Sequence, residues 1–233
     1  MDSISWSDDQ VRRFWDRAAQ APESYASYRV GKNIARRIAR PLRHARDVLD
    51  FGCGPGFLIP YLSAYGPRVG GCELSPETAA LANERLAGRA NFDGVFSAVE
   101  WTERNRSFDL VTCIEVIEHL KDDALEAALH AIHRLLKPRG ILVVTTPNDE
   151  NLSQDMVVCP NCSVEFHRWQ HVRSWTAASL TALLEAKGFR VLSAKEDDFA
   201  FPPGFPWTLA RFARDRIAGK RKRPQLLLQA MRI

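Results

Sequence analysis

The chain has 233 residues, of which 45% are hydrophobic and 26% are charged, and its formal net charge is +4. This composition is that of a globular protein, and the length allows one sizeable core with short appendages. The mild charge gives no strong case for a protein that binds nucleic acid over its whole surface.

Residues 1–40 predict an N-terminal helical cap, because residues 8–40 carry helical patterning. The first ten residues are polar and acidic, unlike a secretory signal, and no apolar run reaches the roughly 18 residues that span a bilayer. Since the five cysteines occur without such a signal, we expect a cytoplasmic protein with free thiols.

Residues 41–198 alternate short apolar runs with amphipathic segments, the pattern of βαβ units and a parallel sheet. One expected helix has Ser75 as its N-cap and Pro76 at its first position, and another is stopped by Pro138 and Gly140. The fold class is therefore α/β, a doubly wound, mostly parallel sheet that binds ligands at the carboxyl ends of its strands. The expected strands are DVLDFG, RVGGCEL, FDGVFSAV, FDLVTCIEV, GILVVTTP and RVLSAKED, about six or seven in all.

Two segments depart from this alternation. Residues 149–175 follow the fifth strand as an insertion that carries Cys, His and aromatic residues. Residues 199–233 form a C-terminal tail rich in Pro, aromatic and basic residues, which is a docking helix, an interface or a flexible end. Part of this tail is basic, which is compatible with contact to RNA, to an acidic partner or to the surface of a membrane.

Glycines directly follow the first expected strand, at Gly52, Gly54 and Gly56. Glycine lets the backbone turn tightly and approach a ligand closely. The spacing is G-x-G-x-G rather than the G-x-G-x-x-G of dinucleotide sites, and Asp50 beside it would repel a pyrophosphate but attract an ammonium or a sulfonium. Glu73 ends the next strand, where an acid can bind both ribose hydroxyls. These features favour S-adenosylmethionine over NAD as the ligand.

The segments VLDFGCGPG, GCELS, FDLVTCIEVIEHL and LLKPRGILVVTTPN closely resemble, in this order, the class I S-adenosylmethionine-dependent methyltransferases. The resemblance covers about residues 46–197. It implies the seven-stranded, Rossmann-like sheet of that family, with Asp50, Gly52 and Gly54 at the amino acid part and the ribose of the cofactor. It also implies that Glu73 binds the ribose.

The residues expected to contact adenine depart from the usual pattern of the family. The family usually offers an acid or another polar residue to the adenine amino group after the third strand, and here Ser97 stands at that position. We therefore expect Ser97 or the backbone of Ala98 to make the contact, with Leu74 packed on the adenine ring. The cofactor-binding residues that the resemblance implies are Arg29, Asp50, Gly52, Cys53, Gly54, Glu73, Leu74, Ser97, Ala98 and Ile114.

The N-terminal segment adds further candidates. SYRVGKNI is similar to a segment of the ubiquinone-pathway O-methyltransferases in which an arginine meets the cofactor carboxylate. Arg29 is thus either a cofactor contact or a surface arginine. Likewise Phe14, Trp15, Tyr25 and Tyr28 either close over the cofactor, as the resemblance implies, or serve only for packing.

The stretch CIEVIEHL brings Glu115, Glu118 and His119 to one face if it is helical. The insertion supplies His167 and His171 in FHRWQHVRSWT. Small-RNA 2'-O-methyltransferases carry a similar arrangement, Glu-x-x-Glu-His after the fourth strand and a histidine in the loop after the fifth, which binds a divalent ion. By this resemblance Glu115, Glu118, His119 and His171 would bind a metal, and such a donor set suits Mg²⁺, Mn²⁺, Zn²⁺ or Fe²⁺.

Three interpretations of this tract stay open. A metal would lower the pKa of an aliphatic hydroxyl and fix its angle of attack. Without a metal, His119 or His171 is the natural general base, since the pKa of histidine lies near neutrality. In the third interpretation Glu115 hydrogen-bonds to backbone groups, and Glu118 lies near a helix N-terminus, where negative charge is favourable. His119 is then a buried, hydrogen-bonded histidine. The candidate catalytic residues are His119, His171 and Glu118.

The insertion also contains Cys159 and Cys162 at C-x-x-C spacing, shortly before His167. One interpretation is a turn with two free thiols. Another is a small, separate zinc clip of Cys159, Cys162 and His167, although the spacing is shorter than that of a zinc finger. A redox pair is a third, but the pair does not open a first βα unit as in thioredoxin-like proteins.

The sequence therefore predicts an S-adenosylmethionine-dependent O-methyltransferase with a small hydroxylated acceptor, such as a sugar or glycan precursor, a quinol or a natural-product polyol. One alternative is RNA 2'-O-methylation, which the metal resemblance and the basic tail favour. The cysteine pair and the lack of a separate RNA-binding module speak against it. The other alternative is a non-catalytic, cofactor-binding partner subunit.

Overall fold

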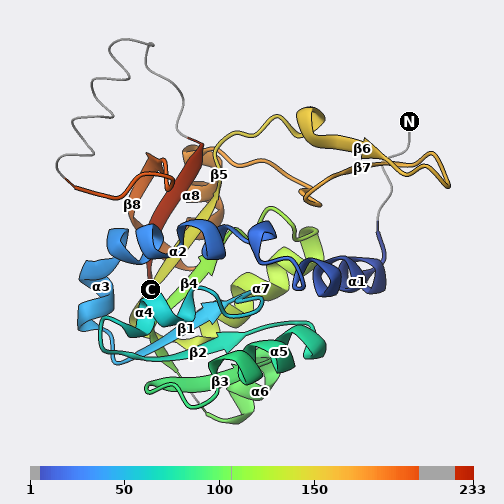
Figure 1. Cartoon of the computed structure of the whole chain (residues 1–233). Helices are drawn as coiled ribbons and strands as arrows, with labels where there is room; N and C mark the ends of the chain where they lie inside the picture. Colours follow the sequence, from blue (N-terminus) through green and yellow to red (C-terminus); the bar gives the residue numbers. More distant parts are fainter. Residues whose placement is uncertain (1–5, 106, 205–223) are drawn as a thin grey trace.

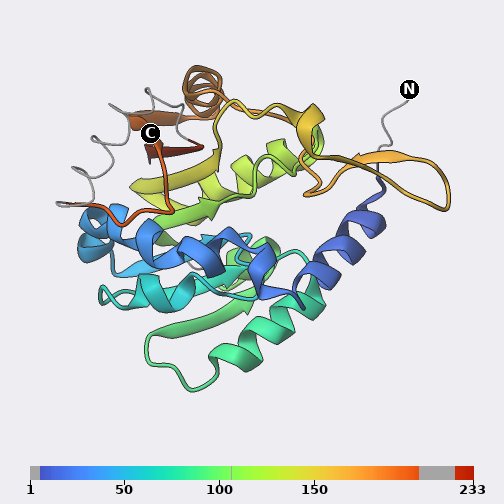
Figure 2. The same ribbon diagram turned by 45° about the horizontal axis from the view of Figure 1, so that its top comes forward.

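Seven strands form one sheet in the order β3-β2-β1-β4-β5-β9-β8, with helices on both faces (Figure 1, Figure 2). The computed structural model describes residues 6–105, 107–204 and 224–233. Strands β1 to β5 run parallel, and β9 is antiparallel to both of its neighbours. The prediction of a doubly wound, mostly parallel, seven-stranded α/β sheet with an N-terminal helical cap is confirmed. The strands are β1 (Asp47–Phe51), β2 (Arg68–Cys72), β3 (Phe92–Phe96), β4 (Phe108–Ile114), β5 (Leu136–Pro147), β8 (Phe189–Asp197) and β9 (Gln225–Arg232).

Each face of the sheet has its own apolar core, because successive side chains of a strand point to opposite faces. On β5, for example, Leu142 and Val144 join one cluster and Val143 joins the other. The first cluster is covered by α6 (Ala98–Glu103), α7 (Asp122–Leu135) and α8 (Ala177–Ala186). The second is covered by α2 (Ala26–Arg37), α3 (Ala39–His44), α4 (Ile59–Ser63) and α5 (Pro76–Leu86).

Two helix predictions can be checked at their ends. Ser75 is the N-cap of α5, since its side chain accepts a hydrogen bond from the N–H of Thr78, and Pro76 is the first helical residue. Helix α7 ends at Leu135, and the Pro138–Gly140 segment already belongs to the extended β5. None of the helices in the described part of the chain is long and apolar enough to cross a membrane.

Strand β9 was not predicted, although it lies within residues 199–233, which the sequence analysis assigned to a tail. It inserts between β5 and β8. Leu226 and Leu228 join one core cluster and Leu227 joins the other, so the strand is buried on both faces. The basic part of the tail, within residues 205–223, lies outside the described residues. The prediction that it is a docking helix, an interface or a flexible end therefore also concerns residues outside the described part of the chain.

The insertion after β5 forms a 3-10 turn (η2, Leu152–Asp155) and a hairpin of β6 (Met156–Val158) and β7 (Glu165–His167) that projects from the carboxyl edge of the sheet (Figure 1, Figure 2). Its two ends are joined at the base: the N–H of Asp149 donates to the carbonyl of Trp175 at 2.6 Å. The insertion therefore leaves and rejoins the fold beside the ends of the central strands.

The cap is anchored to the sheet by an ion pair. Arg37 of α2 contacts Asp197 at 2.6 Å, and the side chain of Arg37 is only 5% exposed. Its guanidinium also donates to the carbonyls of Asp198 and Phe201, each at 2.9 Å. One arginine thus joins the cap to the end of β8 and to the segment that follows.

We expect Arg37→Ala to lower the free energy of unfolding by about 3 kcal/mol, because it removes the cation paired with the largely buried carboxylate of Asp197. Urea denaturation followed by circular dichroism measures the change. Arg36→Ala, one residue earlier and exposed, is the matched control and should change the value by less than about 0.5 kcal/mol. Equal losses in the two variants would contradict an anchoring role for Arg37.

Candidate active site

A cavity of about 890 Å³ lies at the carboxyl ends of the central strands. It is lined by the glycine loop after β1, the end of β2, the turn after β4, the insertion and the N-terminal helices. This is the edge at which a doubly wound sheet binds its ligands. The cavity is therefore the place to look for the predicted cofactor and metal residues.

The glycine loop needs its glycines for backbone reasons. Gly52 and Gly54 have φ angles of 71° and 52°, in the left-handed region that side chains rarely adopt. A Cβ on Gly52 would lie 2.6 Å from the side chain of Val116, and one on Gly54 would lie 2.5 Å from the ring of Tyr25. The loop thus passes so close to its neighbours that no other residue fits.

Glu73 holds this loop from the end of β2. Its carboxylate accepts hydrogen bonds from the N–H groups of Gly54 at 2.9 Å, Leu74 at 2.8 Å and Ser75 at 3.1 Å. Burial raises the pKa of Glu73, and these N–H donors oppose the rise. A carboxylate has about four lone-pair positions, so Glu73 keeps capacity for one more donor.

Asp50 lies behind the loop rather than in the cavity wall. It is 3% exposed and accepts a hydrogen bond from the hydroxyl of Thr112 at 2.8 Å. Burial and, to a smaller extent, the nearby Glu73 carboxylate raise the pKa of Asp50 to about 7, against the opposing effect of the Thr112 hydroxyl. Two acids so close together favour a cationic ligand group, which would allow both to be ionised.

The other predicted cofactor residues divide into two groups. Arg29, Leu74, Ile114, Ser97 and Ala98 line the cavity. Cys53 does not; it is 3% exposed, beneath the loop.

The hydroxyl of Ser97 is engaged within its own helix. It accepts from the N–H of Glu100 at 3.2 Å, and the Glu100 carboxylate accepts from the N–H of Ser97 at 2.8 Å, a capping box at the start of α6. Ser97 therefore has a structural reason to be serine, and the backbone of Ala98 is the freer candidate for an adenine contact.

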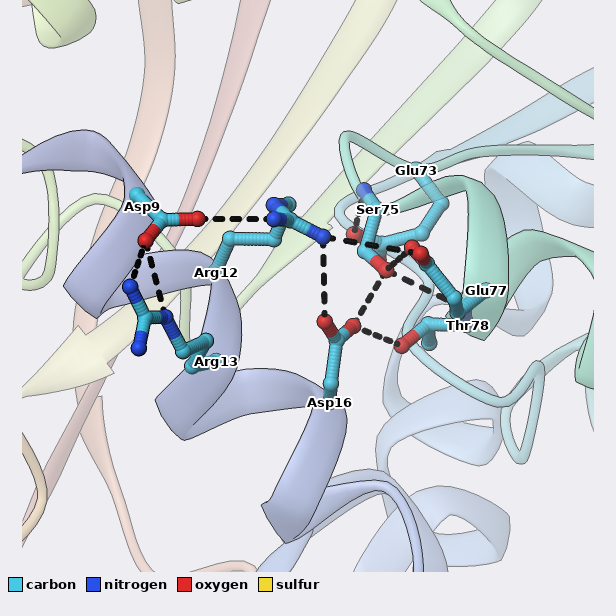
Figure 3. Close-up of polar contacts among 8 residues, drawn as sticks. All are labelled: Asp9, Arg12, Arg13, Asp16, Glu73, Ser75, Glu77 and Thr78. Carbon is cyan, nitrogen blue, oxygen red and sulfur yellow. Dashed lines mark hydrogen bonds and ion pairs between the residues drawn. The ribbon is translucent and has the colours of Figure 1, made fainter.

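Helix α1 (Asp8–Ala18) closes one side of the cavity, held by polar contacts to α5 (Figure 3). Asp16 accepts hydrogen bonds from the hydroxyls of Ser75 and Thr78, the latter at 3.2 Å. Arg12 lies 3.5 Å from the carboxylate of Glu77. Trp15 and Tyr25 both line the cavity from the N-terminal segment.

The conformation of the tract CIEVIEHL, which the sequence left open, is a turn: residues 115–120 are not helical, and α7 begins only at Asp122. The end of β4 leads into Glu115 with a φ of 54°, and the N–H of His119 donates to the carbonyl of Val116 at 3.1 Å. The turn, and not helical spacing, brings the side chains of Glu118 and His119 close together.

Glu118 and His119 lie within this turn. Oε2 of Glu118 accepts from the hydroxyl of Thr146 at 3.1 Å, whereas the buried Oε1 has no hydrogen-bond partner among the described residues. Nε2 of His119 lies 4.0 Å from that Oε1, too far for a hydrogen bond. Nδ1 of His119 lies 3.4 Å from the carbonyl of Gln170, which can only accept, so Nδ1 carries the proton and Nε2 the lone pair.

His171 completes the group. Glu118, His119 and His171 each offer a ligand atom within 4.8 Å of the others. Metal–oxygen and metal–nitrogen bonds are about 2.0–2.2 Å long, so two donors on one cation lie at most about 4.4 Å apart. The 4.0 Å between Oε1 of Glu118 and Nε2 of His119 is within this limit. An unpartnered buried carboxylate oxygen facing an imidazole lone pair therefore suits a bound cation.

Glu115, the fourth predicted ligand, stands apart from these three. Its carboxylate accepts from the hydroxyl of Thr145 at 2.8 Å, and no described cluster of ligand atoms includes it. Burial raises the pKa of Glu115 to about 7, opposed by Thr145 and by the proximity of His171. Burial likewise raises the pKa of Glu118, and it lowers the pKa of His119 to about 3, so His119 is neutral at pH 7.

Glu150 was missed by the sequence analysis. One of its oxygens lies 2.5 Å from Nδ1 of His171 and the other 3.8 Å from Nε2 of His167. These three residues form the second group of ligand atoms within 4.8 Å of one another in the described part of the chain. The only sequence hint is an acid three residues after the end of β5, in a segment already suspected of carrying function.

The structure does not bring the predicted zinc clip together. In the β6–β7 hairpin His167 is paired with Met156, near the base, while Cys159 lies at the tip, where its N–H donates to the carbonyl of Val164. Side chains alternate along a strand, so Cys159 and His167 point to opposite faces of the hairpin. Backbone N–H groups of Cys162 and Asn161 lower the pKa of the Cys159 thiol.

The family of the chain follows from comparison with known proteins. A family model described as a methyltransferase domain matches residues 22–194. A ubiquinone biosynthesis O-methyltransferase of Xanthomonas campestris pv. campestris (strain B100) is 34% identical over 142 residues, covering 59% of this chain and 57% of that protein. A protein of Mycolicibacterium smegmatis named as a probable S-adenosylmethionine-dependent methyltransferase is 33% identical over 162 residues, covering 70% of this chain and 57% of that protein. The chain thus spans less than two thirds of the length of either relative.

Solved structures show the same fold. The 1,6-didemethyltoxoflavin-N1-methyltransferase of Burkholderia thailandensis, solved with 1,6-didemethyltoxoflavin and S-adenosylhomocysteine, superposes with a TM-score of 0.66 at 19% identity, covering 100% of this chain and 93% of that one. The family model covers the glycine loop, the turn after β4 and the insertion. The chain therefore belongs to the class I S-adenosylmethionine-dependent methyltransferases.

Proposed function

We propose that the protein transfers the methyl group of S-adenosylmethionine to a hydroxyl group of a small molecule, such as a sugar or glycan precursor, a quinol or a natural-product polyol. The observation that carries this proposal is the buried, unpartnered Oε1 of Glu118 beside the lone pair of His119, in a cavity that also contains the glycine loop. The curated relatives named as ubiquinone O-methyltransferases support an oxygen acceptor.

The glycine loop and the two acids behind it would bind the cofactor. The backbone of the loop at Gly52 and Gly54 lines the cavity and would approach the ribose and the amino acid part, and Glu73 has acceptor capacity left for one ribose hydroxyl. The negative charge of Asp50 would favour the ammonium group of the cofactor. Arg29, which lines the same cavity, is the candidate partner of the carboxylate. When bound, the cofactor supplies an activated methyl on a sulfonium, so the protein has mainly to position the acceptor and to help remove its proton.

Glu118, His119 and His171 would hold a divalent ion near the acceptor. A bound ion would lower the pKa of a sugar or polyol hydroxyl, which is otherwise a poor acid. The burial of Glu118 suits this role, because a buried carboxylate is stabilised by a paired cation. If no ion binds, His171 is the better candidate for the base, since Nδ1 of His171 faces a carboxylate and Nδ1 of His119 faces only a carbonyl.

We expect Glu73→Ala to weaken the binding of S-adenosylhomocysteine about 10–100-fold, because the ribose would lose a charged acceptor worth about 1.5–3 kcal/mol. Isothermal titration calorimetry measures the affinity. Glu73→Gln separates binding from folding, since an amide oxygen can still accept from the loop. Glu84→Ala, on the exposed side of α5, should bind as the unaltered protein does. Unchanged affinity in Glu73→Ala, with the fold intact, would remove Glu73 from the cofactor site.

The metal assignment predicts that methyl transfer stops in the presence of EDTA and returns when Mn²⁺ is added. Glu118→Gln and His119→Ala should each weaken Mn²⁺ binding at least about tenfold, because each removes a ligand. His130→Ala is the matched control, an exposed histidine of α7. The assay covers sugars, quinols and short RNAs. Activity that persists in EDTA would refute the metal, and activity on RNA alone would replace the small acceptor by RNA. Binding of S-adenosylmethionine without methyl transfer to any of these acceptors would instead favour a non-catalytic partner subunit.

A further inference from the structure

Glu150 is held between two imidazole rings at the entrance of the insertion. Its side chain is 19% exposed, whereas those of His167 and His171 are 4% and 10% exposed. The two rings are stacked, with centroids 4.6 Å apart and planes at 22°. A buried arrangement of one acid and two histidines needs a reason, and the reason can be a second cation or the orientation of a catalytic group.

The hydrogen bonds around His167 speak against a second cation. Nδ1 of His167 accepts from the backbone N–H of His171 at 3.1 Å, so its lone pair is already used. In a neutral ring the proton then sits on Nε2, the nitrogen that lies 3.8 Å from Glu150. Nε2 is buried and has no partner among the described residues. A metal at Nε2 would need the lone pair that this nitrogen lacks, so His167 presents an N–H towards the carboxylate of Glu150.

The hydrogen bonds around His171 give the opposite result. Nδ1 of His171 lies 2.5 Å from a carboxylate oxygen of Glu150, which accepts a proton and does not donate one when it is ionised. Nδ1 of His171 therefore carries the hydrogen. The lone pair of the neutral ring is left on Nε2, available to a cation or to a proton. Carboxylates fix metal-binding and catalytic histidines in this way, and they also raise the basicity of the free nitrogen.

The backbone conformation orients the side chains of Glu150 and His171. Asp149 and Gln170 directly precede Glu150 and His171, and both are in the left-handed region, with φ angles of 47° and 60°. Such a conformation is strained in a residue other than glycine and persists where neighbours enforce it. Here the N–H of Gln170 donates to the carbonyl of His167 at 2.8 Å, and its side chain accepts from Trp15 at 2.9 Å.

We propose that Glu150 is a positioning residue, which fixes His171 in the Nδ1–H tautomer and so leaves its Nε2 lone pair to the site formed with Glu118 and His119. His167 supports the carboxylate from its other side. The catalytic meaning of this arrangement rests on the proposed function, but the tautomer of His171 is a property of the free protein and can be measured without substrate or metal.

The test is ¹⁵N NMR of histidine-labelled, full-length protein at pH 8 in the presence of EDTA, with the His171 signals assigned from their loss in His171→Asn. We expect the Nδ1–H tautomer of His171 to predominate in the unaltered protein. It should lose that predominance in Glu150→Ala and keep it in part in Glu150→Gln, whose amide oxygen still accepts. Glu165→Gln, an exposed glutamate of β7, is the matched control and should leave the tautomer unchanged.

A second measurement asks what the tautomer is for. In titrations with Mn²⁺ we expect Glu150→Ala to bind 10- to 100-fold more weakly, about the effect of removing an orienting partner, and Glu165→Gln to bind normally. An Nδ1–H tautomer that survives Glu150→Ala, or an Nε2–H tautomer in the unaltered protein, would overturn the proposal even if methyl transfer is confirmed. A tautomer change on its own would uphold it even if the protein binds no Mn²⁺.

Discussion

The site depends on carboxylates that stay buried at the carboxyl edge of the sheet. A buried charge is costly unless hydrogen bonds and opposite charges compensate it. Asp50 at the end of β1 accepts a hydrogen bond from the hydroxyl of Thr112 in β4. Glu118, after β4, accepts one from the hydroxyl of Thr146 in β5. Parallel neighbours thus satisfy one another's acids, while Glu73 is satisfied by backbone N–H groups. Each acid receives enough donors to be buried but keeps acceptor capacity, which a cationic group or a hydroxyl can use.

A second constraint is that three separate parts of the chain must meet over these acids, and they do so at Gln170. The buried side chain of Gln170 accepts from Trp15 of α1, and its carbonyl faces Nδ1 of His119 in the turn after β4. The ring of Trp15 also packs edge-on against His119, with centroids 4.6 Å apart. The cap, the turn and the insertion therefore define one another's positions, and a change in any of them reaches the histidines.

The sequence was informative where a function depends on neighbours along the chain, and it failed where it depends on neighbours in space. The glycine loop and Glu73 could be found from spacing, because strand, loop and helix follow one another. Strand β9 could not, because it pairs between β5 and β8, out of chain order. The sequence did not decide between a turn and a helix at Glu115, since both conformations bring residues three and four apart together. Glu150 acquires its meaning only because the insertion folds back and places His171 beside it.

The two histidines of the site show how one residue type acquires two roles. Both have Nδ1 engaged and therefore leave Nε2 with the lone pair. His119 faces a backbone carbonyl and lies in a buried setting that lowers its pKa to about 3, so it is suited to being a neutral ligand. His171 faces the carboxylate of Glu150, which favours the proton on Nδ1. His171 is thus held in one tautomer by a charged acceptor, and His119 only by a neutral one. The asymmetry comes from Glu150, one acid of the insertion, and not from the strands that carry the rest of the site.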